Sequence, residues 1–378
     1  MPRGPDRRLA KRDVGVGVSA LVLSVVLAVP AFAQWQITSA DGQSSLKLGY
    51  LLQGRAEWEK IGTDSDATTS QNLYLRRIRL LFGGKINDRL SFFAETDAPN
   101  TAKASADGAK DYPDVYMQDF MATWTVKDAL LLDFGLLLTP GAYNHLQSAA
   151  SLLTLDYGPY TFVESALLKA KVGRDVGMQA RGILADKHLE YRAALLQGVR
   201  GVLAQNSFRM AGHLSYTPFE AANALFYSGT SLGKKKAFTV GLGADAQRDY
   251  RAYFGDVYAD YPLASGQAVT LQGNYATYDG GDFLGSDPSP LNNLYKQHTY
   301  MIEAGYTFVA QKVTPFIQMS GKTYDNELEG QNERGLQFGL AYWLDGHKSN
   351  LKAGYTLLMK DDNDDHALFT VQCQAFSF

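Results

Sequence analysis

Two glycine-rich stretches have the residue types of catalytic or nucleotide-binding motifs, but their surroundings disagree with those roles. Residues 229–233 read Gly-Thr-Ser-Leu-Gly, the spacing of a hydrolase nucleophile elbow. That elbow needs a strand before it and a helix after it, whereas residues 234–236 are lysines that lead into an alternating segment. Residues 241–246 match a dinucleotide fingerprint in spacing, yet they alternate like a strand and open no helix. The sequence therefore predicts no catalytic residue and no cofactor.

An acidic stretch is similar to the beginning of a calcium-binding loop. Residues 361–365 read Asp-Asp-Asn-Asp-Asp, but His366 stands where such a loop needs glycine, and Gln372 stands where a glutamate would close the site. A solvated hairpin tip is therefore favoured, and loose binding of divalent ions shared with lipopolysaccharide is the alternative. The six histidines are scattered without metal-ligand spacing, so no metal site is predicted.

The remaining chemistry is that of charges placed along alternating strands. If such strands enclose a water-filled lumen, bases and acids on its facing walls create a transverse electric field that slows apolar solutes. A ring of charges of one sign would instead select ions. The residues predicted to line a pore and its constriction are Arg77, Arg79, Glu95, Asp97, Asp119, Asp133, Lys169, Lys171, Arg181 and Arg192. The same alternation places further charges in the lumen, namely Glu190, Arg209, Asp245, Asp256, Glu303, Lys322 and Lys352. The alternative role of any single pair is to stabilise the wall.

Two groups of residues are expected near or on the apolar outer face. Arg76 has the opposite parity from Arg77 and Arg79, so its side chain should snorkel toward water or lie at the outer rim. Aromatic residues near strand ends are expected to form interfacial girdles, for example Tyr50, Trp124, Tyr216, Tyr342 and Trp343.

The elements that must position these charges are strands of about ten residues, as a membrane barrel requires. Tyr300, Ile302 and Ala304 begin one apolar face, and Leu351 and Ala353 begin another. Sixteen strands are predicted, over residues 45–58, 71–84, 89–97, 115–126, 129–138, 174–184, 188–198, 206–217, 235–248, 250–262, 267–279, 297–309, 311–323, 333–344, 348–360 and 366–378. The last strand should pair with the first and so close the ring without a free edge.

The connections alternate between short turns and long loops, which predicts turns in the periplasm and loops outside the cell. The longest connection, 139–173, is expected to fold into the pore with a short helix around 146–153, and an external flap is the alternative. Residues 222–233 look like a strand, but counting them would reverse every later strand. They are interpreted as an extended periplasmic connection, with an eighteen-strand barrel as the competitor.

The N-terminus has the three parts of a secretory signal. A basic segment is followed by an apolar run over 14–29 and by Ala31-Phe32-Ala33, which predicts cleavage after residue 33 and a barrel domain over 34–378. A single membrane helix is disfavoured because the apolar run is short of ~20 residues. The chain has 36 Lys and Arg against 39 Asp and Glu, without the basic excess of a nucleic-acid-binding protein. One cysteine, Cys373, excludes an internal disulfide.

Two consecutive segments resemble the opening of the phosphate-selective porins O and P. Residues 72–85 (NLYLRRIRLLFGGK) are similar to that family's L-R-R-x-R-L-x-F-x-G, and residues 90–100 (LSFFAETDAPN) to its L-x-F-x-x-E-x-D-x-x-N. The resemblance implies a sixteen-stranded, usually trimeric channel with an inward-folded third loop. Where the family commonly has G-Q-F-K-x-P, residues 135–140 read GLLLTP, with Leu138 in place of the lysine. This departure argues against anion selectivity.

The sequence thus predicts an all-β outer-membrane porin, with a sixteen-stranded antiparallel barrel, for passive diffusion of small hydrophilic solutes or ions. An anion- or phosphate-selective channel is the alternative, and an outer-membrane barrel enzyme or an adhesin is less favoured. The expected partners are outer-membrane lipid and lipopolysaccharide, two further copies of the chain, and the barrel-assembly machinery, which would bind through Phe378. No nucleic acid is expected.

Overall fold

The computed structural model describes residues 35–62, 68–219, 221, 224–285, 294–325, 331–361 and 365–378. The predicted signal, 1–33, and residues 362–364 of the acidic stretch lie outside the described residues. The barrel belongs to one compact unit, Ala33–Phe378.

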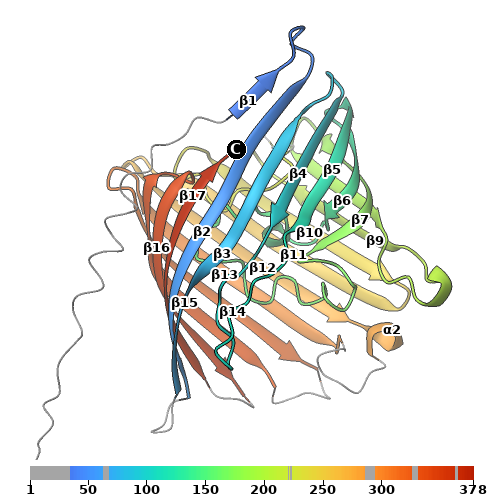
Figure 1. Cartoon of the computed structure of the whole chain (residues 1–378). Coiled ribbons are helices and arrows are strands. Elements are labelled where there is room, and N and C mark those ends of the chain that lie inside the picture. The colour runs from blue at the N-terminus through green and yellow to red at the C-terminus, as the bar shows by residue number, and fades with distance from the viewer. Residues whose placement is uncertain are drawn as a thin grey trace, which may run out of the picture. The chain divides into compact units, whose positions relative to one another are not determined.

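Sixteen antiparallel strands form a closed ring, as predicted (Figure 1). Each strand pairs with the next, and the last pairs with the first from His366 opposite Ile61 to Ser377 opposite Tyr50. The strands are β2 (Ser45–Ile61), β3 (Thr68–Lys85), β4 (Leu90–Asp97), β5 (Tyr116–Lys127), β6 (Leu130–Leu138), β7 (Arg174–Leu184), β8 (Leu189–Leu196), β9 (Arg209–Tyr216), β10 (Ala237–Gln247), β11 (Tyr250–Pro262), β12 (Gln267–Asp279), β13 (Gln297–Phe308), β14 (Val313–Tyr324), β15 (Glu333–Asp345), β16 (Ser349–Lys360) and β17 (His366–Ser377).

A short strand that the sequence analysis missed lies at the seam of the ring, where β17 pairs with β2. β1 (Trp35–Thr38) pairs with the first residues of β2, directly beyond the stretch of β2 that pairs with β17. Among the described residues, the remaining regular elements are the 3-10 helices η2 (Tyr143–Leu146) and η3 (Val202–Ala204) and the one-turn helix α2 (Gly281–Gly285).

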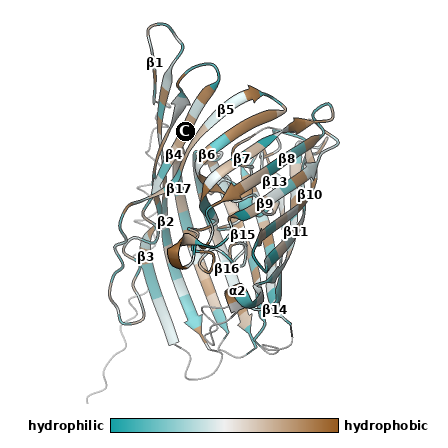
Figure 2. Ribbon diagram, turned by 90° about the vertical axis from the view of Figure 1, so that its right-hand side faces the viewer, coloured by the Kyte–Doolittle hydropathy of each residue, from teal (hydrophilic) through white to brown (hydrophobic). Residues whose placement is uncertain are grey.

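Alternation gives the wall an apolar outer face, and Figure 2 shows apolar and polar residues alternating along the strands. In β11, Tyr253 and Val257 are exposed, whereas Phe254 and Asp256 between them are buried. One aromatic residue of the expected girdles has the other orientation. Trp343 is 2 % exposed and donates from Nε1 to Thr314 Oγ1 at 2.9 Å, because strand parity turns it inward when its neighbour Tyr342 faces out.

The connections lie at two ends of the barrel. At the end that we call the turn end, β3, β5 and β15 are joined to their successors by short turns, and the C-terminus is marked there in Figure 1. The opposite end, the loop end, has the connections 98–115 and 139–173. The β9–β10 connection, 217–236, also lies at the turn end, but it is long, unlike the short turns there.

Two segments of the long connections fold into the lumen, one from each end of the barrel. Residues 139–173, the inner loop, enter from the loop end, and Leu146 and Leu153 are fully buried. The helix expected at 146–153 is wrong: a single 3-10 turn, η2, precedes it, and hydrogen bonds to the barrel wall take the place of helical ones. Residues 224–232, the turn-end segment, enter from the other end and form no strand, which confirms sixteen strands rather than eighteen.

Candidate pore site

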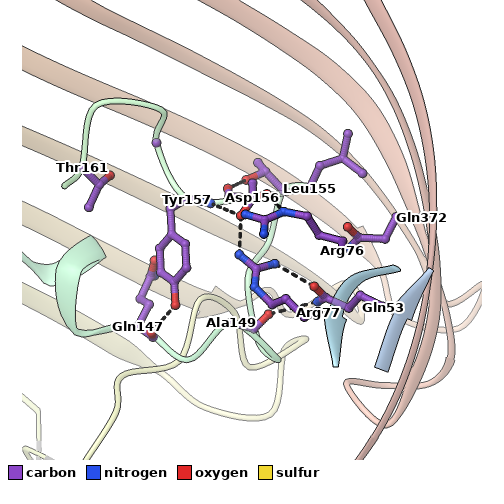
Figure 3. A network of polar contacts seen from close by, with 12 residues as sticks. Gln53, Arg76, Arg77, Gln147, Ala149, Leu155, Asp156, Tyr157, Thr161 and Gln372 are labelled. Carbon is purple, nitrogen blue, oxygen red and sulfur yellow. Dashed lines mark hydrogen bonds and ion pairs between the residues drawn. The ribbon is translucent and has the colours of Figure 1, made fainter. Parts of the chain in front are cut away.

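One carboxylate of the inner loop, Asp156, meets three arginines of the wall, of which Arg76 and Arg77 are labelled in Figure 3. Asp156 Oδ1 lies 2.6 Å from Arg77 Nη2, and its Oδ2 lies 2.9 Å from Arg76 Nε and 3.2 Å from Arg55 Nη2. Tyr157, the next residue, donates its hydroxyl to Gln147 O at 2.8 Å, which ties this corner of the loop to its own first turn. The result is a compact polar network at the β2–β3 wall.

Arg76 and Arg77 can point to the same side because β3 contains a bulge. Gly54 of β2 is opposite Leu75, while Gln53 is opposite Arg77, so Arg76 has no partner in the register. A bulge inserts one extra residue and locally breaks the alternation of sides. The expected outward position of Arg76 is therefore wrong.

Asp156 remains ionised in this site. Burial by itself raises the pKa of a carboxyl group, but the neighbouring charges of Arg76, Arg77 and Arg55 outweigh that effect and hold the pKa of Asp156 well below its usual range. Three guanidinium groups meet this carboxylate, and Glu57, 3.5 Å from Arg55, offsets part of the local excess of positive charge.

A second group of ion pairs continues along the same wall. Arg79 binds Glu95 at 2.8 Å and Asp97 at 2.9 Å, both on β4. Arg174, the first residue of β7, binds Asp119 of β5 at 3.2 Å. The structure thus brings together four of the predicted pore residues, and all four are buried within the barrel: Arg79, Glu95, Asp97 and Asp119.

Other predicted strand residues form pairs farther around the ring, whereas Lys352 donates to backbone oxygens of the inner loop and the two predicted loop lysines stay apart. The pairs are Arg181 with Asp133 at 2.7 Å, Arg192 with Glu190 at 2.9 Å and Arg209 with Asp245 at 2.9 Å. Lys169 and Lys171 are exposed, and Lys171 lies over the ring of Tyr116 at 3.8 Å. Neither lysine joins the Asp156 network.

A cavity of about 550 Å³ adjoins the Asp156 network. Its charged lining includes Arg76, Arg77, Arg79, Asp97, Asp156 and Arg174. Apolar groups from the inner loop and from β16 and β17, such as Phe162, Leu358 and Leu368, line other parts of it. Water and small solutes inside this cavity would therefore meet charges of both signs.

Three members of the site were not predicted: Arg55, Asp156 and Arg174. Arg55 alternates with Gln53 and Glu57 on the inward face of β2, so strand parity could have found it. Asp156 lies in an irregular loop, where no periodicity tells which way a side chain points.

The described residues contain no group of three or more His, Cys, Asp or Glu side chains arranged to hold a metal ion. No helix within the described ranges is long and apolar enough to cross a membrane.

A closed sixteen-stranded barrel with an apolar outer face and a loop folded into its charged lumen defines the class of outer-membrane porins. The model of the family "Phosphate-selective porin O and P" matches residues 52–254, more than half of the chain. The chain belongs to this family. It is an outer-membrane channel protein of bacteria and not an enzyme.

Solved porins share the fold at low sequence identity. OmpF of Salmonella typhi, in complex with daunomycin, is 20 % identical with a TM-score of 0.58, over 90 % of this chain and 100 % of that one. An anion-selective porin from Comamonas acidovorans is 10 % identical with a TM-score of 0.54, over 89 % and 100 %. OmpT of Vibrio cholerae, in a trimer form, is 11 % identical with a TM-score of 0.53, over 89 % and 100 %. A sequence search among curated proteins found no match.

Proposed function

We propose that this porin allows passive diffusion of small hydrophilic solutes and ions past a constriction formed by the Asp156 network. The observation that carries the proposal is the convergence of Arg55, Arg76 and Arg77 on a carboxylate of the inner loop beside the cavity. Fixed charges of both signs order water across a lumen and so favour polar solutes over apolar ones. The pairs Arg79–Glu95 and Arg174–Asp119 extend the constriction along the wall.

The charge balance of the network gives a second candidate, an anion preference. Arg76 reaches Asp156 only through Nε, and no hydrogen bond of its terminal nitrogens is found among the described residues. Its side chain is 21 % exposed and lines the cavity. A guanidinium group with unused donors binds carboxylate and phosphate well. The family's name and the anion-selective porin of similar fold support this candidate, and Leu138 in place of the family's lysine argues against it.

Reversal potentials in a KCl gradient test the constriction and separate the two candidates. Asp156→Asn removes the carboxylate that all three arginines contact, while Glu57 stays 3.5 Å from Arg55, so the reversal potential should move toward the chloride equilibrium potential. Arg77→Ser should move it the opposite way. Asp107→Asn is the matched control because Asp107 is exposed and bonds only within its own loop. If Asp156→Asn and Arg77→Ser both behave like the control, the network is not the constriction.

We further propose that residues 1–33 are removed on export and that three copies of the chain assemble. The signal pattern supports the first proposal, and the trimer form of OmpT, whose fold is similar, supports the second. The outer face would contact lipid and lipopolysaccharide, and the strand that carries Phe378 would be recognised by the assembly machinery. N-terminal sequencing of the exported protein should begin at Gln34, and cross-linking in membranes should give a trimer.

A further inference from the structure

The turn-end segment, 224–232, crosses the lumen and joins the inner loop through its backbone. Tyr227 donates its N–H to Leu146 O at 2.7 Å, and its carbonyl oxygen accepts from the N–H of Ser148 at 2.9 Å. Tyr227 therefore forms a parallel bridge with Gln147. Two loops that enter the barrel from opposite ends are thus hydrogen-bonded to each other inside it.

Aromatic stacking strengthens this junction. The ring of Tyr143, in the inner loop, lies between Tyr227 and Tyr258 of β11, with ring centroids 4.6 Å and 4.3 Å apart. The Tyr143 hydroxyl also donates to Ser228 O at 3.1 Å. Stacked aromatic pairs contribute beyond the area they bury, so the three rings fix the inner loop against the segment and the wall.

Paired charges of β8 hold the segment at the wall. Arg192 donates to Ala224 O at 2.6 Å and to Leu225 O at 3.2 Å, and its guanidinium group lies 4.7 Å from the centre of the Tyr227 ring. Glu190 accepts from the hydroxyl of Tyr227 at 2.9 Å and from Arg192. These two charged residues therefore orient the segment in addition to neutralising each other.

The segment also reaches walls on other sides of the lumen. Phe226 contacts Phe93 of β4 edge to face, with centroids 5.4 Å apart. Thr230 is fully buried, shares a hydrogen bond with Thr270 of β12 at 3.0 Å, and presents its carbonyl oxygen to His347 Nε2 at 2.8 Å. Contacts to four separate parts of the barrel mean that the segment spans the lumen.

The residue in which the chain departs from its family lies at this junction. Leu138, in place of the family's lysine, is buried in a cluster with Tyr143, Leu146, Tyr227 and Tyr258. A lysine at this position would bring a charge into an apolar cluster, which is unfavourable without a partner. The leucine is therefore compatible with the docked segment.

We propose that the turn-end segment is a second constriction element, which positions the inner loop from the turn end and thereby sets the conductance of the channel. Tyr227 is its central positioning residue, because it contributes the backbone bridge, the stack and the bond to Glu190. This inference rests on the proposed diffusion function. If the segment only filled space beside the conducting path, loosening it would leave the current unchanged.

Single-channel recording of the full chain in planar bilayers tests the proposal. Tyr227→Ala removes the stack and the hydroxyl, and should raise the open-channel conductance about twofold and increase the current noise. Tyr227→Phe keeps the ring and should fall between wild type and Tyr227→Ala. Tyr253→Ala is the matched control because Tyr253 faces outward and is 59 % exposed.

A milder variant keeps the test valid if Tyr227→Ala does not fold. A Cβ atom at Gly229 would lie 2.5 Å from Ser151 O of the inner loop, so Gly229→Ala must move the two loops apart. At Gly255, on the outer side of β11, no atom lies within 4 Å of an added Cβ, so Gly255→Ala is its control. Folded Tyr227→Ala or Gly229→Ala protein with wild-type conductance and noise would overturn the second constriction. A wild type without channel activity would overturn the diffusion function itself.

Discussion

Arg79 is the cation that neutralises two carboxylates of the neighbouring strand, and this makes it a sensitive position. Its guanidinium group binds Glu95 and Asp97, and all three side chains are almost fully buried. Removing one partner of such a group leaves uncompensated buried charge, which costs about 3–5 kcal/mol. Arg79→Gln should therefore lower the free energy of unfolding by about this amount. It should also shift the reversal potential toward cations.

Urea titration in detergent, followed by the gel mobility of the folded barrel, measures the loss of stability. Arg89→Gln is the control, because Arg89 is exposed in the turn between β3 and β4. If Arg79→Gln were as stable as this control, Glu95 and Asp97 would have to be hydrated by water in the lumen, contrary to their burial in the structure.

His145 gives the inner loop a predictable dependence on pH. Burial, and then the charges of Arg209 and His213, lower the pKa of His145 from 6.5 to about 3. The folded state therefore needs the neutral imidazole, and the stability that this residue contributes is complete above pH 6.5 and is lost as the pH falls toward 3. Glu164 has the opposite effect on stability, because burial raises its pKa from 4.5 to about 7. The stability that Glu164 contributes is therefore complete below pH 4.5 and is lost as the pH rises toward 7.

The comparison of wild type with His145→Gln separates these two effects. In the wild type the two effects oppose each other between pH 6.5 and 4.5, so the current noise should change little there and should rise as the pH falls from 4.5 toward 3, where His145 alone still titrates. The variant lacks the contribution of His145, so its noise should fall between pH 6.5 and 4.5 and should not rise below pH 4.5. Noise against pH in planar bilayers is the measurement. Parallel curves for the two proteins would show that His145 does not titrate with the loop.

Parity along strands was sufficient to predict which wall residues face inward, including Arg77, Glu95 and Asp133. It failed at Arg76, because a bulge is a local exception that the pattern of apolar residues does not encode. Strand parity could not predict the orientation of Asp156, because side chains in an irregular loop do not alternate with a fixed period. Whether the residues around Asp156 form the constriction stays a prediction for the reversal potentials to decide.

At the scale of elements, the closure of the ring depends on a close approach between glycine and the chain's last residues. A Cβ atom added at Gly49 of β2 would lie 2.1 Å from Ser377 O and 2.8 Å from Phe378 Cδ2. The backbone oxygen of a paired strand has little room to move. Gly49→Ala should therefore destabilise the barrel by about 1–3 kcal/mol, as overpacking commonly does.

The urea midpoint of the mobility shift measures this effect, with Gly255→Ala as the control strand glycine that has open space around it. Assembly of Gly49→Ala in membranes should also be slower, because the seam between β2 and β17 closes the ring. Equal midpoints for the two variants would indicate that the terminal Phe378 ring is not held at the seam.

The elements themselves were predicted well from period and turn residues, since all sixteen wall strands were found within a few residues of their bounds. The short strand β1 was missed because four residues give too little pattern. The path of 224–232 through the lumen was missed for another reason: its contacts with Leu146, Ser148 and Glu190 join residues far apart in the sequence. Local pattern has no access to such contacts.

For the whole molecule, a ring of paired strands predicts a high barrier to unfolding. The pairing of β17 with β2 leaves no free edge in the ring, so the backbone ladder has no end from which it can open. Inside, the inner loop links the distant strands β2 and β12 through bonds such as Gln53 to Ala149 O and Gln147 to Gln272, which must break in the same event. The folded protein should therefore survive sodium dodecyl sulfate at room temperature and unfold only on heating.

Gel electrophoresis of the purified protein with and without boiling tests this, because a compact barrel and an unfolded chain migrate differently. Boiling should change the mobility of the wild type, and Gly49→Ala should need a lower temperature for the same change. The exposed aromatic and aliphatic side chains on the outer face, for example Phe134, Leu242 and Ile302, also require detergent or lipid to stay in solution. A protein that dissolved without detergent, or migrated identically before and after boiling, would contradict the closed membrane barrel.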